Sequence, residues 1–154
     1  MSFHGGLIGV IISTILFSKK SDINFFKISD IISCVAPIGI FLGRMANFIN
    51  GELYGRVTDM PWGMIFPSGG NEPRHPSQLY EAFLEGVVLF VVLYVLSRNE
   101  KICKQAGLLT GIFMVGYAVA RGAVELVRQP DPHLGILTGG LTMGQWLSIP
   151  VFLF

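Results

Sequence analysis

Charged side chains are scarce in this sequence, and those present nearly cancel. Of 154 residues, 11 are lysine or arginine and 10 are aspartate or glutamate, which leaves a formal net charge of +1. A chain so close to neutral exerts no long-range attraction on nucleic acid, and no basic run exceeds the pair Lys19 and Lys20. The composition therefore argues against a nucleic-acid partner.

Cysteine is nearly absent, which disfavours two common ways of stabilising a small domain. The two cysteines, Cys34 and Cys103, form neither a CxxC pair nor a Cys/His cluster, so a disulfide framework and a zinc site are both weak interpretations. The sequence also lacks a glycine-rich nucleotide loop, and we expect neither a metal nor a cofactor. The N-terminal apolar stretch has no basic region before it and no small-residue cleavage site after it, which argues against a signal peptide.

Apolar residues, by contrast, make up 51% of the sequence and raise its mean hydropathy to +0.60. These values lie far above those of a soluble domain of this length. The apolar residues fall into five runs, at 7–17, 28–50, 76–96, 107–126 and 143–154. We therefore predict an all-α fold, a polytopic membrane helix bundle that forms a single membrane domain over 1–154.

The runs differ in whether they can cross a bilayer. Even residues 5–18, around the first run, would span only about 21 Å as a helix, against a hydrocarbon core of about 30 Å. The run at 28–50 is long enough to span, and Pro37 predicts a kink within it. Close helix contact is predicted at two small-xxx-small pairs, Gly39 with Gly43 and Gly107 with Gly111.

Between the second and third runs, residues 51–75 are polar and rich in proline and glycine. This proline- and glycine-rich composition predicts an ordered loop or small cap outside the lipid. Its aromatic residues Trp62 and Phe66 suit the headgroup zone of a membrane, where amphipathic rings collect.

Most basic residues that flank the apolar runs lie at the ends away from the 51–75 segment. They predict the orientation of the chain, because cytoplasmic loops carry an excess of lysine and arginine. These residues are Lys19, Lys20, Lys27, Arg98, Lys101 and Lys104. The 51–75 segment is therefore expected to be extracytoplasmic.

Two arginines lie within or at the end of apolar runs, where a charge is costly. An arginine near the lipid core costs at least about 2.5 to 3.5 kcal/mol, so it normally faces a protein interior or a polar cavity. Arg44 and Asn47 are three residues apart and share one helix face, while Arg121 lies between Tyr117 and Glu125 at four-residue spacing. An arginine pair at one membrane level suits a phosphodiester, because the planar guanidinium binds phosphate oxygens bidentately.

Each of these residues also has a plain structural interpretation. The two arginines could extend to the lipid headgroups, and Glu125 could simply neutralise Arg121. Asn47 could be a hydrogen-bonding contact between helices, and Tyr117 an aromatic residue of the membrane interface.

The remaining polar residues leave similar alternatives open. His4, next to two glycines, could be a structural loop residue, although the ordinary pKa of histidine also suits a base. Glu52 adds a carboxylate to the segment that carries Arg44. Glu81 and Glu85 share a helix face, and we interpret them as structural partners of the loop or of an arginine.

Four ordered motifs give the chain a specific resemblance. They are HGGLIG at 4–9, GRMANFINGELYGR at 43–56, RHPSQLYEAFLEG at 74–86 and GYAVARGAVELVRQPD at 116–131. With these motifs the chain resembles the prolipoprotein diacylglyceryl transferases, bacterial inner-membrane enzymes of lipoprotein maturation. The resemblance implies transfer of a diacylglyceryl group from phosphatidylglycerol to the thiol of the lipobox cysteine in a preprolipoprotein signal peptide, with release of glycerol phosphate and without a cofactor.

The resemblance also implies roles for individual residues. Those implied to be catalytic are His4, Glu52, Tyr117, Arg121 and Glu125. Those implied to bind substrate are Gly5, Gly6, Arg44, Asn47 and Gly55. Transfer requires removal of a thiol proton, of pKa about 8.5, and stabilisation of a developing phosphate charge. The arginines suit the second task, while His4, Glu52 and Glu125 all stay open as the base.

The family pattern extends past this sequence at both ends. It includes two further membrane helices upstream, with an essential tyrosine, and the completion of a last helix downstream. We therefore expect the isolated chain to be inactive as a transferase. The competing class of function is a transporter or channel that binds an anionic substrate with the same arginines, but transporter folds usually show internal repeats and none is visible here.

The predicted orientation can be tested with a cysteine placed in the 51–75 segment. Ser68→Cys should react with a membrane-impermeant maleimide in sealed cells, because the lysine-rich loops lie on the opposite side. The measurement is the extent of labelling before and after permeabilisation. Labelling that appears only after permeabilisation would contradict the orientation.

Overall fold

The computed structural model describes residues 3–128, with side chains from Gly5 onward. The predicted run at 143–154 and the side chain of His4 lie outside this part. The elements are α1 (Phe3–Ser21), α2 (Phe25–Asn50), η1 (Pro67–Gly69), α3 (Ser77–Glu81), η2 (Ala82–Val88), α4 (Leu89–Ser97), α5 (Glu100–Cys103) and α6 (Leu108–Glu125). The described residues are joined by isolated bridges but form no strand, so the all-α prediction is confirmed.

Three stretches of the described chain are helices long and apolar enough to cross a membrane. They are α2, the continuous helix Ser77–Ser97 that contains α3, η2 and α4, and α6. The predicted polytopic bundle is therefore confirmed for these helices. Helix α1, whose apolar run looked short, is not among the three.

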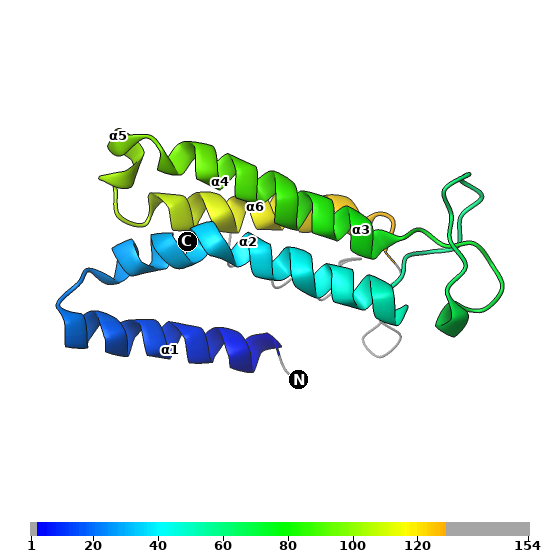
Figure 1. Ribbon diagram of the computed structural model, residues 1–154, viewed down its shortest axis with the longest axis horizontal. Coiled ribbons are helices and arrows are strands. Elements are labelled where there is room, and N and C mark those ends of the chain that lie inside the picture. Colours follow the sequence, from blue (N-terminus) through cyan, green and yellow to red (C-terminus); the bar gives the residue numbers. More distant parts are fainter. Residues whose placement is uncertain (1–2, 129–154) are drawn as a thin grey trace, which may run out of the picture.

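The three spanning helices pack against one another, with α2 and α6 both in contact with η2 and α4 (Figure 1). Helix α1 folds back antiparallel to α2 and, among the described elements, contacts only α2 (Figure 1). After the turn between them, the Asn24 side chain accepts a hydrogen bond from the Phe26 N–H at 2.8 Å and caps α2. Leu89, Leu93 and Leu109 form the buried apolar core between α4 and α6.

Two glycines allow the helices to approach closely. A Cβ atom on Gly86 of η2 would lie 2.7 Å from the Cβ of Phe41 in α2, far inside van der Waals contact. A Cβ atom on Gly116 of α6 would lie 2.6 Å from a methyl carbon of Leu89. Helices in lipid associate through such packing rather than through hydrophobic exclusion of water, so these two contacts set the separation of the bundle.

The glycine pairs predicted from spacing are not the packing sites. A Cβ on Gly39, Gly43 or Gly111 would meet nothing within 4 Å among the described residues, so close contact there is wrong for this part of the chain. Gly107 does approach a neighbour, since a Cβ on it would lie 3.2 Å from the ring of Phe26. The physical reason is that small-residue spacing identifies a smooth helix face, whereas the rotation of the helix decides what that face meets.

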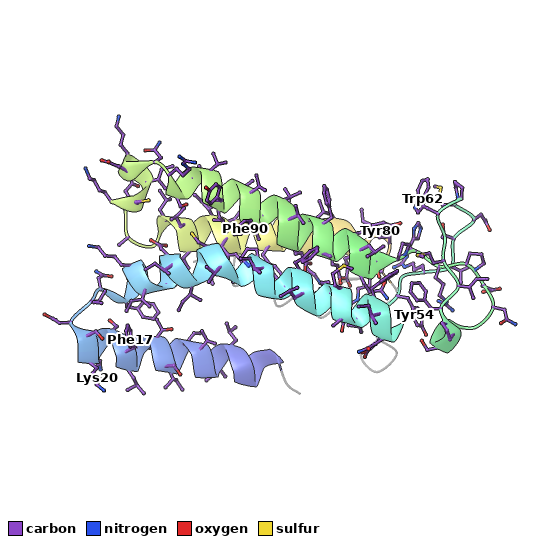
Figure 2. The ribbon with its side chains drawn as sticks, in the orientation of Figure 1. Phe17, Lys20, Tyr54, Trp62, Tyr80 and Phe90 are labelled. Carbon is purple, nitrogen blue, oxygen red and sulfur yellow. The ribbon has the colours of Figure 1, made fainter. Side chains whose placement is uncertain are left out.

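Residues 51–75 form a segment, here called the cap, that extends past the ends of α2 and α3 (Figure 1). Backbone bonds order it, such as the one from the Thr58 N–H to the Pro73 carbonyl at 2.9 Å. The cap also rests on α3, because the Trp62 indole N–H donates to the Tyr80 hydroxyl at 2.9 Å. Figure 2 shows Trp62 and Lys20 at opposite ends of the molecule, as the predicted orientation requires.

Asp30 of α2 is buried and caps the first turn of α6. One carboxylate oxygen accepts from the Gly107 N–H at 2.8 Å, and the other accepts from the N–H and the hydroxyl of Thr110 at 2.8 and 2.7 Å. The first N–H groups of a helix have no partner within it and carry partial positive charge, so a carboxylate stabilises them. Asp30 therefore fixes the start of α6 to α2, a contact that the sequence did not reveal.

We expect Asp30→Asn to destabilise the protein by about 1 to 3 kcal/mol, because the amide loses the charge and turns a donor toward a helix N-terminus. The measurement is the thermal unfolding midpoint in detergent. Asp22→Asn is the matched control, since Asp22 is exposed in the turn between α1 and α2. Equal midpoints for the two variants would show that the cap contributes nothing.

Candidate functional site

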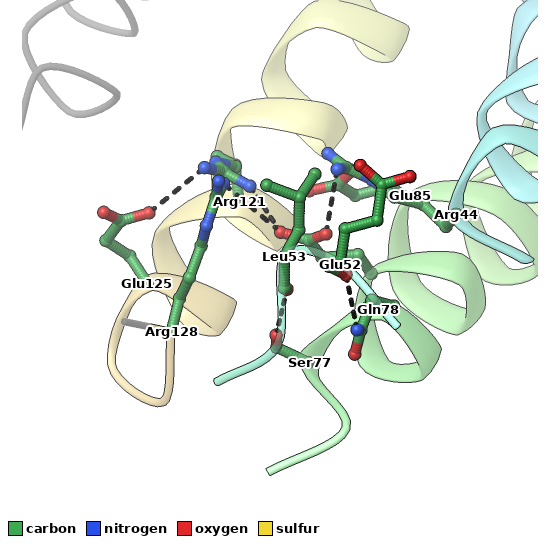
Figure 3. A network of polar contacts seen from close by, with 10 residues as sticks. Arg44, Glu52, Leu53, Ser77, Gln78, Glu85, Arg121, Glu125 and Arg128 are labelled. Carbon is green, nitrogen blue, oxygen red and sulfur yellow. Dashed lines mark hydrogen bonds and ion pairs between the residues drawn. The ribbon is translucent and has the colours of Figure 1, made fainter. Parts of the chain in front are cut away.

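A buried cluster of charges lies at the end of the bundle next to the cap, where Figure 3 shows Arg44, Arg121 and Arg128. Glu81 is at its centre, because its carboxylate contacts all three of these arginines. Its Oε2 lies 3.0 Å from Nη1 of Arg44 in α2. Its Oε1 accepts a hydrogen bond from Nη1 of Arg121 in α6, and Nη1 of Arg128 lies 3.6 Å from the same oxygen. One carboxylate thus links three guanidinium groups.

Each of the first two arginines also has a second carboxylate. Nη2 of Arg44 lies 3.3 Å from Oε2 of Glu85, and Nη2 of Arg121 lies 3.4 Å from Oε2 of Glu125. The charges therefore alternate in the order Glu85, Arg44, Glu81, Arg121, Glu125, which we call the charged row. With Arg128 on Glu81, the formal charges of the cluster sum to zero.

The charged row is shielded from solvent. The side chains of Arg44 and Arg121 are 17% and 16% exposed, and those of Glu81 and Glu85 only 1% and 0%. Both arginines therefore face the interior of the bundle rather than extending to the headgroups. Buried ions persist only when they are paired and hydrogen-bonded, and the alternation of signs supplies that pairing.

Glu81 and Glu85 lie at a change of helix type. Glu81 ends α3, and Glu85 is within η2, a π-helix. A π-helix bonds each N–H five residues back, which locally widens the helix, and such segments are frequent at functional sites. The wider turn lies where Gly86 meets Phe41, and it presents two carboxylates toward α2 and α6.

Two fully buried residues of α3 hold the start of the cap beside the charged row (Figure 3). The Gln78 side-chain N–H donates to the Glu52 carbonyl at 2.6 Å, and the Ser77 hydroxyl donates to the Leu53 carbonyl at 3.0 Å. Leu53 has a φ of 58°, a left-handed conformation that is costly for leucine and is held here by these bonds. Gly51 also has a positive φ, 67°, where it ends α2.

The structure brings together part of the predicted site. Arg44, Arg121 and Glu125 belong to the charged row. The backbone of Glu52 lies beside the row, where its carbonyl accepts a hydrogen bond from Gln78. Its carboxylate is exposed and accepts a hydrogen bond from the Asn50 amide at 2.9 Å. The predicted interpretation of Glu81 and Glu85 as arginine partners is confirmed by their ion pairs.

Of the other predicted residues, Asn47 and Tyr117 lie on the helices that carry the two arginines. Asn47 is half-buried near the end of α2, and its side chain has no hydrogen-bond partner within the described residues. Tyr117 is half-buried on α6, stacks on Phe113 with 6.2 Å between ring centroids, and packs against the apolar core. Gly5 and Gly6 are exposed in the first turns of α1, and the described structure does not bring them to the charged row. The side chain of His4 lies outside the described part.

Sequence reasoning missed two kinds of participant. Arg128 lies within the GYAVARGAVELVRQPD motif but was not among the predicted site residues, although it contacts Glu81 and forms a bridge with Gly55. Ser77 and Gln78 gave no signal beyond their place in the RHPSQLYEAFLEG motif, because their role depends on the path of the cap. That role could not be inferred from helix spacing.

The site presents fixed cations at the end of the helix bundle next to the cap. Carboxylates that can accept protons flank these cations. Within residues 3–128, no three His, Cys, Asp or Glu side chains are grouped so as to hold a metal ion. Guanidinium groups bind oxyanions and carboxylates accept protons, so these residues favour recognition of an oxyanion together with proton transfer to a carboxylate.

Comparison with known proteins matches residues 1–154 to the family model described as prolipoprotein diacylglyceryl transferase. The chain is similar to proteins named phosphatidylglycerol–prolipoprotein diacylglyceryl transferase from Paramagnetospirillum magneticum, Shewanella oneidensis and Rickettsia felis, with 60%, 56% and 56% identity. The alignments cover 97%, 100% and 99% of this chain, but 56%, 56% and 59% of those relatives. The chain thus spans a little over half the length of the curated relatives that it matches.

Gly55 provides a test of whether the cap must lie against the end of α6. A Cβ on Gly55 would lie 2.6 Å from the Val127 carbonyl oxygen and 2.8 Å from the Cβ of His75. We expect Gly55→Ala to lower stability by about 1 to 3 kcal/mol, the usual cost of overpacking. The thermal unfolding midpoint in detergent measures this loss of stability. Gly39→Ala is the control, because it adds the same methyl group in open space. Unchanged stability in Gly55→Ala would show that the cap adjusts freely.

Proposed function

The chain belongs to the prolipoprotein diacylglyceryl transferase family, and from this premise we propose that the protein transfers the diacylglyceryl group of phosphatidylglycerol to the lipobox cysteine of a preprolipoprotein. The names of the similar proteins support both substrates. One observation carries the proposal for this chain: Arg44 and Arg121, from two different membrane helices, converge on the same buried carboxylate.

In the proposed reaction, the cysteine sulfur attacks the glyceryl carbon that bears the phosphate ester. A carbon–sulfur bond forms, and the carbon–oxygen bond to the phosphate breaks. The bonding electrons leave with the phosphate oxygen, so glycerol phosphate departs with one more negative charge than the phosphodiester had. The thiol proton passes to a base on the protein, since the thiolate is the attacking form.

The two arginines suit the charge that develops in this step. A guanidinium remains charged in a dry site and offers a planar set of donors to phosphate oxygens. Both terminal nitrogens of Arg44 and of Arg121 already contact carboxylates, so an incoming phosphate shares those guanidiniums with Glu81, Glu85 and Glu125. Donors held in this way need little reorganisation when the charge grows.

The base stays open among His4, Glu52 and Glu125. Glu125 belongs to the charged row, and Glu52 is exposed at the start of the cap. We propose that Tyr117 takes part in catalysis and that Asn47, Gly5, Gly6 and Gly55 contribute to substrate binding.

We further propose that the protein works in the bacterial inner membrane with its site toward the outer face. The charged row lies at the cap end of the spanning helices, where a phospholipid headgroup of the outer leaflet and the cysteine of an exported prolipoprotein can meet. The family membership disfavours the alternative of an anion transporter or channel.

We expect Arg44→Lys and Arg121→Lys each to lower turnover about 100- to 1,000-fold, because lysine keeps the charge but loses the bidentate geometry. The substitutions are made in the protein as its gene encodes it in full. The measurements are protein level in the membrane and the initial rate of thioether formation on a lipobox peptide with phosphatidylglycerol.

Arg98→Lys serves as the matched control, because Arg98 is exposed at the far end of α4. It should retain the full rate. Near-normal rates for both site variants at normal protein levels would remove the arginines from the phosphate-binding role. Absence of thioether product in the unmodified protein, with flux of an anion instead, would support the transporter alternative.

A further inference from the structure

We propose that Glu81 is a positioning residue, which sets the relative placement of Arg44 and Arg121 without touching the substrate itself. This inference rests on the proposed function, because the placement matters only if both arginines act on one phosphate. Glu81 is the only described residue whose carboxylate pairs with both arginines.

The geometry separates Glu81 from the other carboxylates of the charged row. Its two oxygens face different helices, with Oε2 on Arg44 of α2 and Oε1 on Arg121 of α6. Glu85 contacts only Arg44, and Glu125 only Arg121, among the described ion pairs. Loss of either outer carboxylate leaves the arginines linked, whereas loss of Glu81 removes the link.

The position of Glu81 is itself well determined. Its side chain is almost fully buried, and it ends α3 at the point where the π-helix begins. One turn earlier, Ser77 and Gln78 are anchored to the backbone of the cap. A buried carboxylate on a helix that is itself anchored to the cap can act as a fixed reference for two long, flexible arginine side chains.

Repulsion between the arginines also predicts that loss of Glu81 would change their relative placement. Without the central carboxylate, Arg44 and Arg121 would keep only Glu85 and Glu125, and Arg128 would lose its contact with Glu81. Like charges in a medium of low dielectric constant repel strongly, so the arginines would move apart. A phosphate could then still bind one of them, but it would lose simultaneous contact with both.

A positioning role and a merely stabilising role predict different kinetics. In Glu81→Gln the site gains a unit of positive charge, so the KM for anionic phosphatidylglycerol should not rise. Displacement of a catalytic group by about 1 Å can cost on the order of 100-fold in rate, so kcat should fall by about that factor. If Glu81 only neutralised buried charge, its loss would reduce the amount of folded protein but not kcat per folded molecule.

Glu81→Asp provides a second test that keeps the charge. Its side chain is one methylene shorter and cannot reach both arginines, so positioning predicts a kcat loss of at least about 10-fold. A role in neutralisation alone predicts a normal kcat for this variant. Because Glu81→Asp retains the negative charge, it keeps the inference testable even if Glu81→Gln fails to accumulate.

The experiment measures kcat and KM for phosphatidylglycerol with a lipobox peptide, per folded molecule, on the protein as its gene encodes it in full. Asp30→Asn is the control for buried carboxylates, because Asp30 caps α6 at the opposite end and should affect stability alone. The expected result is a fall in kcat with unchanged or lower KM in both Glu81 variants, and a normal kcat in Asp30→Asn.

Three results would overturn the inference: a normal kcat in Glu81→Asp, a fully active Glu81→Gln, or a loss in Glu81→Gln that lies wholly in KM. Failure of the proposed function has a different signature, since the unmodified protein would then form no thioether. An active unmodified protein with a fully active Glu81→Gln variant would leave the transferase function intact and remove only the positioning role.

Discussion

Pairing of buried charge is the constraint on which the rest of this structure depends. Three guanidinium groups lie between helices that are apolar enough to cross a membrane, and each is held by a carboxylate. An unpaired buried ion costs several kcal/mol, and removal of one partner of a buried pair typically costs about 3 to 5 kcal/mol. The helices must therefore approach closely and in one register, which the close contacts at Gly86 and Gly116 permit.

Polar contacts connect α2 to its neighbours at both ends of the bundle. At one end Asp30 caps α6, and at the other Arg44 shares Glu81 with Arg121. The contacts between these ends are apolar and hardly directional, since lipid is about as apolar as a leucine side chain. Directional bonds at the two ends therefore determine how far α6 can slide or rotate relative to α2. At the Glu81 end, the bonds that fix the fold also place the candidate site.

The sequence predicted features that belong to a single helix. Hydropathy located the spanning helices, and the cost of burying charge singled out Arg44 and Arg121. The sequence did not predict that Asp30 caps α6, that Gly39 and Gly43 lack a close neighbour among residues 3–128, or that a π-helix carries Glu85. Each of these depends on how helices are rotated against one another. Spacing along one chain contains no information on that rotation. It therefore suggested that Glu81 and Glu85 pair with an arginine, but not that Glu81 would pair with both Arg44 and Arg121.

The charge balance of the site bears on which anions it can select. Because Glu81, Glu85 and Glu125 offset the three arginines, the cluster has no net positive charge with which to attract a small anion from a distance. A phosphate must instead compete for guanidiniums that are already paired, which is unfavourable unless the rest of the ligand contributes binding energy. A phospholipid supplies that energy through its acyl chains in the bilayer, and binding energy from remote groups can be used at the reacting centre. A cluster of paired charges without net positive charge thus favours a lipid phosphodiester over free phosphate.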